Sequence, residues 1–199
     1  FSLLLTGCGA AKSENGEVVV YNWGEYIDPD TLTMFEEETG IHVVYDEFET
    51  NEIMYPKVEA GATAYDVICP SDYMIQKMIQ NDLLAEINFD NIPNVKNIGD
   101  QYFEQSKEFD PENKYTIPHY WGTLGILYNT RLVDEEVDSW DILFNQKYSG
   151  QIIMENSVRD SFVPALQLLG YSINTDNTDE LDEAEAMLKE QRPMVQAYL

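Results

Sequence analysis

A repeated alternation of short apolar runs with longer helix-forming segments constrains the fold of this chain more than any other feature. It occupies residues 17–80 of a chain of 199 residues. The pattern predicts strands over 17–22, 41–48 and 65–69, and helices over 30–39, 50–60 and 72–80. Asp28 and Pro29 supply an N-cap and a first-turn proline for the first helix, and Gly40 ends it. Strands joined through helices lie parallel, so we expect an α/β fold with mainly parallel sheets flanked by helices.

Apolar patterning predicts a second α/β unit in the rest of the chain. Extended segments are expected over 83–87, 115–118, 122–129 and 151–154, and helices over 139–144, 158–169 and 179–191. A turn-rich stretch over 88–113 precedes the second unit. We therefore expect residues 1–16 to be a signal remnant and tether, 17–119 a first lobe, and 120–199 part of a second lobe.

Acidic residues dominate the charge of the chain. Thirty-seven Asp and Glu residues against eleven Lys and Arg residues give a formal net charge of −26. Such a field repels phosphate backbones and attracts cations, so nucleic acid is not an expected partner. Solubility alone would explain the charge equally well. The acidic runs at 36–38 and 179–185 lack the spacing of a calcium loop and are expected to be solvated helix faces.

The two cysteines show no paired spacing, so neither a disulfide nor a zinc site is predicted. Cys69 ends the apolar run DVIC and is expected to be a small buried hydrophobic residue. Cys8 ends the segment FSLLLTGC, which resembles the lipobox of a bacterial lipoprotein signal peptide, although a short match also arises by chance. The resemblance implies lipidation at Cys8 and anchoring to the outer face of the cell membrane, or a periplasmic location. Because the sequence starts at Phe1 without a basic segment, we expect it to be truncated at this end.

Aromatic and acidic side chains follow two of the predicted strands. YNWGEYI, residues 21–27, comes at the end of the first strand, and PSDY, residues 70–73, comes after the third. The carboxyl ends of parallel strands meet at one edge of a sheet, where such folds bind ligands. Aromatic faces attract cations, and a carboxylate adds a charge-assisted hydrogen bond to an ammonium group. Core packing would explain any one ring, but the cluster predicts a site for an organic cation.

Motifs spread from residue 18 to the end of the chain resemble one protein family. They are YNWGEYI, ETGIHVVYDEFETNEIMYPKV, YDVICPSDYMIQKM, YTIPHYWGTLGILYN and SWDILFNQKYSGQIIM. They resemble the spermidine/putrescine-binding proteins of polyamine ABC importers, the PotD-type solute-binding family. The resemblance implies a periplasmic-binding-protein-like fold, in which two α/β lobes close over a linear polyamine. It also implies a monomer without a cofactor that delivers the polyamine to an ABC transporter permease in the membrane.

The resemblance also implies ligand contacts, residue by residue. The matching positions of the first lobe are Trp23, Glu25, Tyr26, Ser71 and Tyr73, with Gly24 where some members have threonine. In ENSVRDSF, Asp160 matches an acid that contacts the ligand's amines, whereas Ser157 stands where a second acid is an aspartate. Glu25 and Asp160 are expected to neutralise ammonium groups, while the rings cover the methylene stem. The departure at Ser157 bears on the choice between spermidine, putrescine and a related cation.

Four further residues receive structural expectations. Tyr120 and Trp121 lie near the expected crossing between the lobes, where packing at a hinge is favoured over a place in the cleft. His42 and His119 are isolated and are expected to be structural. The family continues beyond the position of Leu199, so we expect an N-terminal fragment with an incomplete second lobe.

Two rival functions follow from the residues. A hydrolase could use paired carboxylates such as Glu25 and Asp72. The sequence contains no nucleophile elbow, phosphate loop or metal-ligand motif, so an enzyme is not expected. The second rival is a solute-binding protein of the same architecture with another cargo, either ferric ion bound by some of the thirteen tyrosines or a different organic cation.

Overall fold

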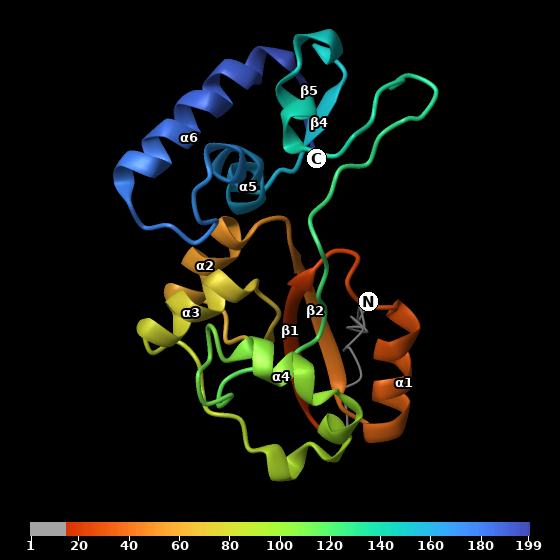
Figure 1. Cartoon of the computed structure of the whole chain (residues 1–199). Helices are drawn as coiled ribbons and strands as arrows, with labels where there is room; N and C mark the ends of the chain where they lie inside the picture. The colour runs from red at the N-terminus through yellow and green to blue at the C-terminus, as the bar shows by residue number, and fades with distance from the viewer. Residues whose placement is uncertain (1–14) are drawn as a thin grey trace, which may run out of the picture. The chain divides into compact units, whose positions relative to one another are not determined.

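The computed structural model describes residues 15–199, so Cys8 and most of the expected tether lie outside the described residues. The chain forms two compact units, the first ending at Trp121 and the second covering Gly122–Leu199 (Figure 1). No helix of the described part is long and apolar enough to cross a membrane.

The first unit is built on a parallel three-stranded sheet of order β2-β1-β3. Strand β1 (Glu17–Trp23) pairs along its whole length with β2 (His42–Phe48), from Glu17 opposite His42 to Trp23 opposite Phe48. Strand β3 (Val67–Ile68) pairs with the other edge of β1. It is shorter than the predicted 65–69, because only its two residues align with β1 as a ladder. The parallel arrangement expected from the alternating pattern is confirmed.

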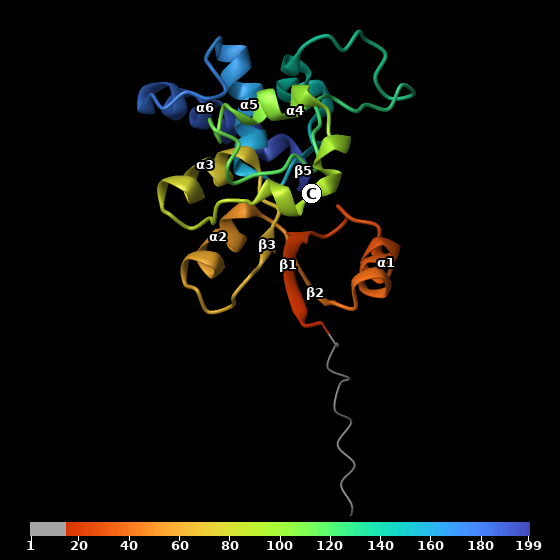
Figure 2. The ribbon, with the colours of Figure 1, turned by 90° about the horizontal axis from the view of Figure 1, so that it is seen from below.

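Helices flank this sheet. They are α1 (Pro29–Thr39), α2 (Asn51–Glu59), α3 (Asp72–Gln80) and α4 (Asp100–Ser106), with 3₁₀ turns η1 (Phe89–Asn91) and η2 (Pro93–Asn97). Figures 1 and 2 show α1 on one side of the strands and α2 and α3 on the other. The capping residues act as predicted: the Asp28 carboxylate accepts a hydrogen bond from the Asp30 N–H, and Gly40 ends α1 at φ 68°.

The core of the first unit lies between the sheet and helices α2 and α3. Its buried residues are Tyr21, Phe48, Met54, Tyr55, Met74 and Met78. The Tyr21 ring stacks on Tyr65 with centroids 4.4 Å apart and meets Phe48 edge-on at 4.9 Å. Aromatic pairs of this kind add about 0.5–1.5 kcal/mol each beyond the area that they bury. The loops that carry the predicted site residues of this unit therefore lie next to a packed core of aromatic rings.

Three segments that were predicted to be extended strands form none. In 83–87 one backbone hydrogen bond joins the Ile87 N–H to the Lys114 carbonyl, and 115–118 and 122–129 have no strand assignment. Their apolar residues fit a strand pattern, but a strand needs a neighbouring ladder for its backbone groups. Within the described residues these segments have no such ladder.

The second unit contains a parallel pair of strands and two helices. Strand β4 (Ile152–Met154) pairs with β5 (Val195–Tyr198), and α5 (Val158–Leu169) packs against α6 (Thr178–Gln191) (Figure 1). The connecting turns are the 3₁₀ segments η3 (Trp140–Phe144), η4 (Gln146–Tyr148) and η5 (Arg192–Met194). The predicted helix over 139–144 is thus a 3₁₀ turn, whereas α5 begins and ends as predicted, with Gly170 closing it at φ 80°.

Asp110 holds the turn that leads into residues 115–121. It is 1% exposed, and its carboxylate accepts hydrogen bonds from the Lys114 N–H at 3.1 Å, the Tyr115 N–H at 2.9 Å and the Thr116 hydroxyl at 2.9 Å. Removing it would leave buried donors without an acceptor, at a cost of about 1–3 kcal/mol.

We therefore expect Asp110→Ala to lower the free energy of unfolding by about 2–3 kcal/mol in urea titrations followed by tryptophan fluorescence. The matched control is Glu112→Ala in the same turn. The Glu112 side chain is 71% exposed and pairs with Lys114 at the surface, so its loss should cost about 1 kcal/mol at most. Equal unfolding midpoints for the two variants would contradict this account of the turn.

Candidate functional site

The loop after β1 carries three of the predicted site residues on an anchored backbone. Asn22 is buried, and its side-chain oxygen accepts a hydrogen bond from the Trp23 N–H at 2.8 Å. The Trp23 ring lies 4.6 Å from Phe48 in the core and 5.7 Å from Tyr26, measured between centroids. Glu25 is exposed on the turn between them, and among the described residues its carboxylate has no hydrogen bond or ion pair. One exposed carboxylate thus lies on the turn that joins the two ring-bearing residues.

Tyr120 extends this group of rings. Its centroid lies 5.0 Å from that of Tyr26, and the residue is 70% exposed. Phe48, Trp23, Tyr26 and Tyr120 therefore form a row of contacting rings, hereafter the aromatic row, that runs from the core to the surface of the first unit. Hinge packing was the favoured expectation for Tyr120, and nothing in the sequence pattern indicated its contact with Tyr26.

The other three residues with structural expectations, Trp121, His42 and His119, each contact another residue of the first unit. His119 places its Nε2 3.1 Å from the Tyr26 carbonyl, which ties residues 119–120 to the first loop. The Trp121 ring lies 6.0 Å from Tyr102 and stays 61% exposed. His42 lies 2.7 Å from Glu36, whose pKa is lowered by hydrogen bonds from the Val43 N–H and from His42. Both histidines thus have hydrogen-bond partners, as expected of structural residues.

The loop after β3 is held by a buried asparagine. Asn51 is 2% exposed, and its side-chain N–H groups lie 3.0 Å from the Ser71 hydroxyl and 2.9 Å from the Tyr73 hydroxyl. Its side-chain oxygen accepts a hydrogen bond from the Ser71 N–H at 3.2 Å. The Tyr73 hydroxyl in turn donates to Glu52 at 3.0 Å. Ser71 precedes α3 but does not cap it, so its hydroxyl is directed to Asn51 instead.

Both loops leave the same edge of the sheet. Parallel strands β1 and β3 pair at Tyr21 and Ile68, so the residues that follow each strand emerge side by side. Trp23 and Tyr73 both pack against the core cluster that contains Phe48. The structure therefore brings the five predicted residues of the first unit to one edge, with the carboxylates of Glu25 and Glu52 at that edge.

Cys69 differs from its expectation. It is half-buried and not fully buried, and its backbone N–H donates a hydrogen bond to the Tyr21 carbonyl. Burial raises the pKa of its thiol to about 11, so the thiol is protonated at neutral pH. It is therefore suited to packing and not to nucleophilic chemistry.

In the second unit Ser157 and Asp160 share the first turn of α5. The Ser157 hydroxyl accepts a hydrogen bond from the Asp160 N–H at 3.3 Å and so acts as the N-cap. Asp160 is partly buried, and within the described residues its carboxylate has no hydrogen bond or ion pair. The spacing Ser-x-x-Asp before an apolar run is a capping signal in the sequence, so Ser157 has a structural role besides the predicted ligand contact.

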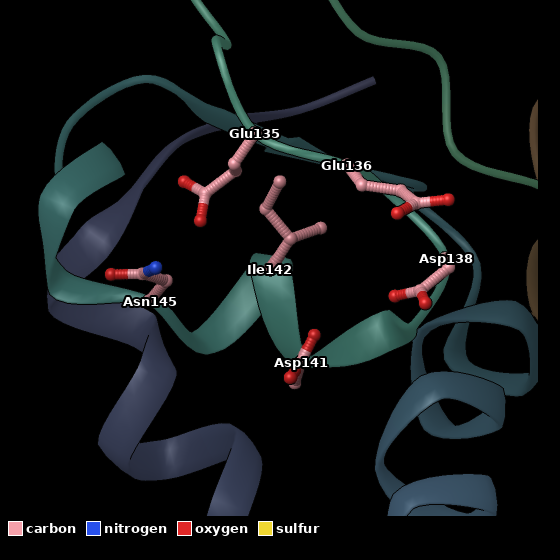
Figure 3. A pocket seen from close by; sticks show the side chains of 6 residues that line it. All are labelled: Glu135, Glu136, Asp138, Asp141, Ile142 and Asn145. Atoms are coloured by element: carbon pink, nitrogen blue, oxygen red, sulfur yellow. The ribbon is translucent and has the colours of Figure 1, made fainter.

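The second unit also has an acidic pocket of about 330 Å³. It is lined by Glu135, Glu136, Asp138, Asp141, Ile142 and Asn145 (Figure 3). Glu135 is already engaged by Lys147 at 3.2 Å and by the Tyr148 hydroxyl, and both lower the pKa of its carboxyl. Among the described residues no group of His, Cys, Asp and Glu is arranged to hold a metal ion. None of the predicted ligand-binding residues lines this pocket.

Residues 30–198 match the family model of the bacterial extracellular solute-binding proteins. The chain belongs to this family. It is 37% identical to the spermidine/putrescine-binding periplasmic protein of Escherichia coli K12, over 98% of this chain and 56% of that protein.

Two solved structures agree with this assignment. One is the spermidine/putrescine ABC transporter substrate-binding protein PotD of Streptococcus pneumoniae, with 43% identity and a TM-score of 0.71 over 92% of this chain and 56% of that one. The other is the TpPotD lipoprotein of Treponema pallidum, with 30% identity and a TM-score of 0.83 over 92% and 57%. The chain thus spans little more than half the length of these relatives.

These relatives confirm two predictions made from the sequence. The resemblance to the spermidine/putrescine-binding proteins is confirmed, and so is the periplasmic-binding-protein-like α/β fold. Proteins of this family are extracytoplasmic and hold a solute without transforming it, which agrees with the expectation that the chain is not an enzyme.

Proposed function

We propose that this protein captures a polyamine outside the cytoplasm and delivers it to the permease of an ABC importer. The observation that carries the proposal is the edge of the first unit, where Glu25 lies on the turn between two residues of the aromatic row and the hydroxyls of Ser71 and Tyr73 are held in place. A flexible chain with ammonium groups and methylene stems matches carboxylates set among rings. Asp160 of the second unit is proposed to neutralise a further ammonium group.

Cation–π attraction and charge-assisted hydrogen bonds supply the affinity. Each ring contributes about 0.5–2 kcal/mol, depending on how dry the site becomes, and a hydrogen bond to a charged group about 1.5–3 kcal/mol. A micromolar dissociation constant needs about −8 kcal/mol. Two such rings and two such carboxylates contribute about 4–10 kcal/mol before the ordering costs of binding, so a micromolar site needs further contacts besides these four. Contacts from both units favour a closed form, because the ligand then binds the closed form more tightly than the open one.

We also propose that Cys8 is lipidated and anchors the protein to the outer face of the cell membrane. The lipobox-like segment before Cys8 supports this, as does the lipoprotein among the relatives. Anchored in this way, a monomer would meet a membrane permease at the same surface. Globomycin, which blocks signal-peptide cleavage of lipoproteins, should cause an unprocessed precursor to accumulate, and Cys8→Ala should release the protein from the membrane fraction.

Calorimetric titration of the purified protein at its natural length with spermidine, putrescine and choline tests the ligand class. We expect heat of binding with at least one of the two polyamines and a change in tryptophan fluorescence. Trp23→Ala should weaken binding about tenfold, the loss of one strong cation–π contact. Trp140→Phe in the second unit is the control and should leave affinity unchanged. A colour band from iron(III) phenolate, with no polyamine heat, would favour the ferric-ion alternative instead.

Tyr120 should contribute to the same binding event, because its ring continues the aromatic row at the surface. We expect Tyr120→Ala to weaken polyamine binding about threefold to tenfold and Tyr120→Phe, which keeps the ring, to leave it within about twofold. Tyr102→Phe, which keeps the ring of a tyrosine outside the row, serves as a control for tyrosine changes in the same unit. An unchanged affinity in Tyr120→Ala would assign Tyr120 to hinge packing.

Ser157 offers a gain-of-affinity test. Aspartate caps helices as well as serine does, so Ser157→Asp should keep α5 intact and add a second acid to that of Asp160. We expect polyamine binding to tighten about threefold to tenfold, with a steeper salt dependence. Asn177→Asp is the matched control, since Asn177 is the N-cap of α6 and the substitution adds the same charge. Equal affinities for the two variants would remove Ser157 from the site.

A further inference from the structure

A pair of neighbouring side chains at the start of α2 joins the two loops beyond β2 and β3. Asn51 is the first residue of α2 and follows the N-cap Thr50, whose side chain accepts a hydrogen bond from the Ile53 N–H. Glu52 follows it and is exposed. Asn51 reaches 20 positions along the chain to Ser71 and 22 positions to Tyr73. Neither residue belongs to the set assigned to the ligand above.

Donor and acceptor accounting fixes the direction of these hydrogen bonds. An asparagine amide nitrogen is only a donor, so the Ser71 and Tyr73 oxygens must accept from Asn51. A carboxylate is only an acceptor when ionised, so the proton of the Tyr73 hydroxyl points to Glu52. Asn51 is 2% exposed, and a buried amide that lost these partners would pay the full cost of desolvation. These side-chain hydrogen bonds therefore run in one direction, from Asn51 to Ser71 and from Asn51 through Tyr73 to Glu52.

The direction matters for a cationic ligand. Two hydrogen bonds, from Asn51 and to Glu52, hold the Tyr73 phenol and so set the plane of its ring. The Ser71 oxygen already accepts one hydrogen bond from Asn51, which leaves its second lone pair to accept from an ammonium N–H group. Bonds in such a chain polarise one another in the same direction. Ordering the two side chains in advance also lowers the entropy cost of binding.

We propose that Asn51 and Glu52 are positioning residues that fix the Tyr73 ring and orient the Ser71 hydroxyl toward an ammonium group. The inference rests on the proposed function, and it adds a second tier of residues that act through Ser71 and Tyr73 without touching the ligand. It assigns to this tier the preference for amines that carry N–H donors, such as spermidine, over quaternary ammonium ions, which have none.

The first test replaces Glu52, because an exposed carboxylate can change without unfolding the protein. We expect Glu52→Gln to weaken spermidine binding about threefold to tenfold in calorimetric titration. The matched control is Glu59→Gln on the same helix, where Glu59 accepts a hydrogen bond from the Tyr55 hydroxyl at 2.9 Å. It removes the same charge and the same type of bond but should change affinity less than about twofold. Equal effects of the two substitutions would reduce the role of Glu52 to net charge.

The second test is a double-mutant cycle on Asn51. Asn51→Ala should weaken spermidine binding about tenfold in the otherwise natural protein and less than about twofold when Ser71→Ala and Tyr73→Phe are already present. A residue that only stabilises the fold would give the same loss of affinity in both backgrounds. Asn81→Ala is the control, since the Asn81 side chain donates to the Lys77 carbonyl at the far end of α3. Urea unfolding of each variant separates folding from binding.

The outcomes separate the inference from the function on which it rests. If the natural protein binds spermidine and Asn51→Ala and Glu52→Gln bind equally well, the positioning role is wrong and the proposed function stands. If the natural protein binds no polyamine, the proposed function fails and the inference fails with it. Equal losses of affinity for Asn51→Ala in the two backgrounds would also overturn the positioning role.

Discussion

The parallel pairing of β1 with strands on both of its sides is the constraint on which the site depends. It forces β1, β2 and β3 to end at one edge of the sheet. The loop of Glu25, the start of α2 at Asn51 and the loop of Ser71 therefore emerge together, although they are far apart in sequence. Within the described residues, the groups proposed to bind a cation come from three separate segments, and the topology brings these segments together.

Buried polar side chains at this edge hold the loops in fixed positions. Asn22 and Asn51 are 4% and 2% exposed, and the side-chain amide of each forms hydrogen bonds with the backbone or side chains of a site loop. Such groups are costly to bury without partners, so each has a strong preference for one arrangement of the loop that it bonds. The Tyr21 ring packs against Phe48, and the Trp23 ring packs against Phe48 in turn. The edge is thereby organised before any ligand arrives.

The sequence predicted what is encoded locally and missed what depends on distant partners. Helices α3 and α5 follow their predicted limits, and for α5 the N-cap Ser157 and the terminal Gly170 mark both ends locally in the sequence. The expected strand at 83–87 is absent because its apolar pattern carries no information about a ladder partner. Two contacts could not be predicted from the sequence: the Tyr120 ring beside Tyr26, and the hydrogen bond from Asn51 to Tyr73. Each joins residues that only the folded chain brings together. The first-loop residues stand out in the sequence because their chemistry is unusual for a core, and their role in binding stays a prediction.

The charge of the chain and the geometry of its site favour the same kind of ligand. With 37 acidic residues and 11 basic ones, the protein must gather cations from solution. Six of its lysines are already held by its own side chains: Lys107, Lys114, Lys147 and Lys189 by carboxylates, and Lys57 and Lys77 over tyrosine rings. The attraction of a solute to the remaining negative field grows in proportion to its charge, so a di- or triamine is enriched far more than a monovalent ion. Under the proposed function, the field favours a ligand with several positive charges, and the rings and hydroxyls favour the spacing and the N–H groups of an amine.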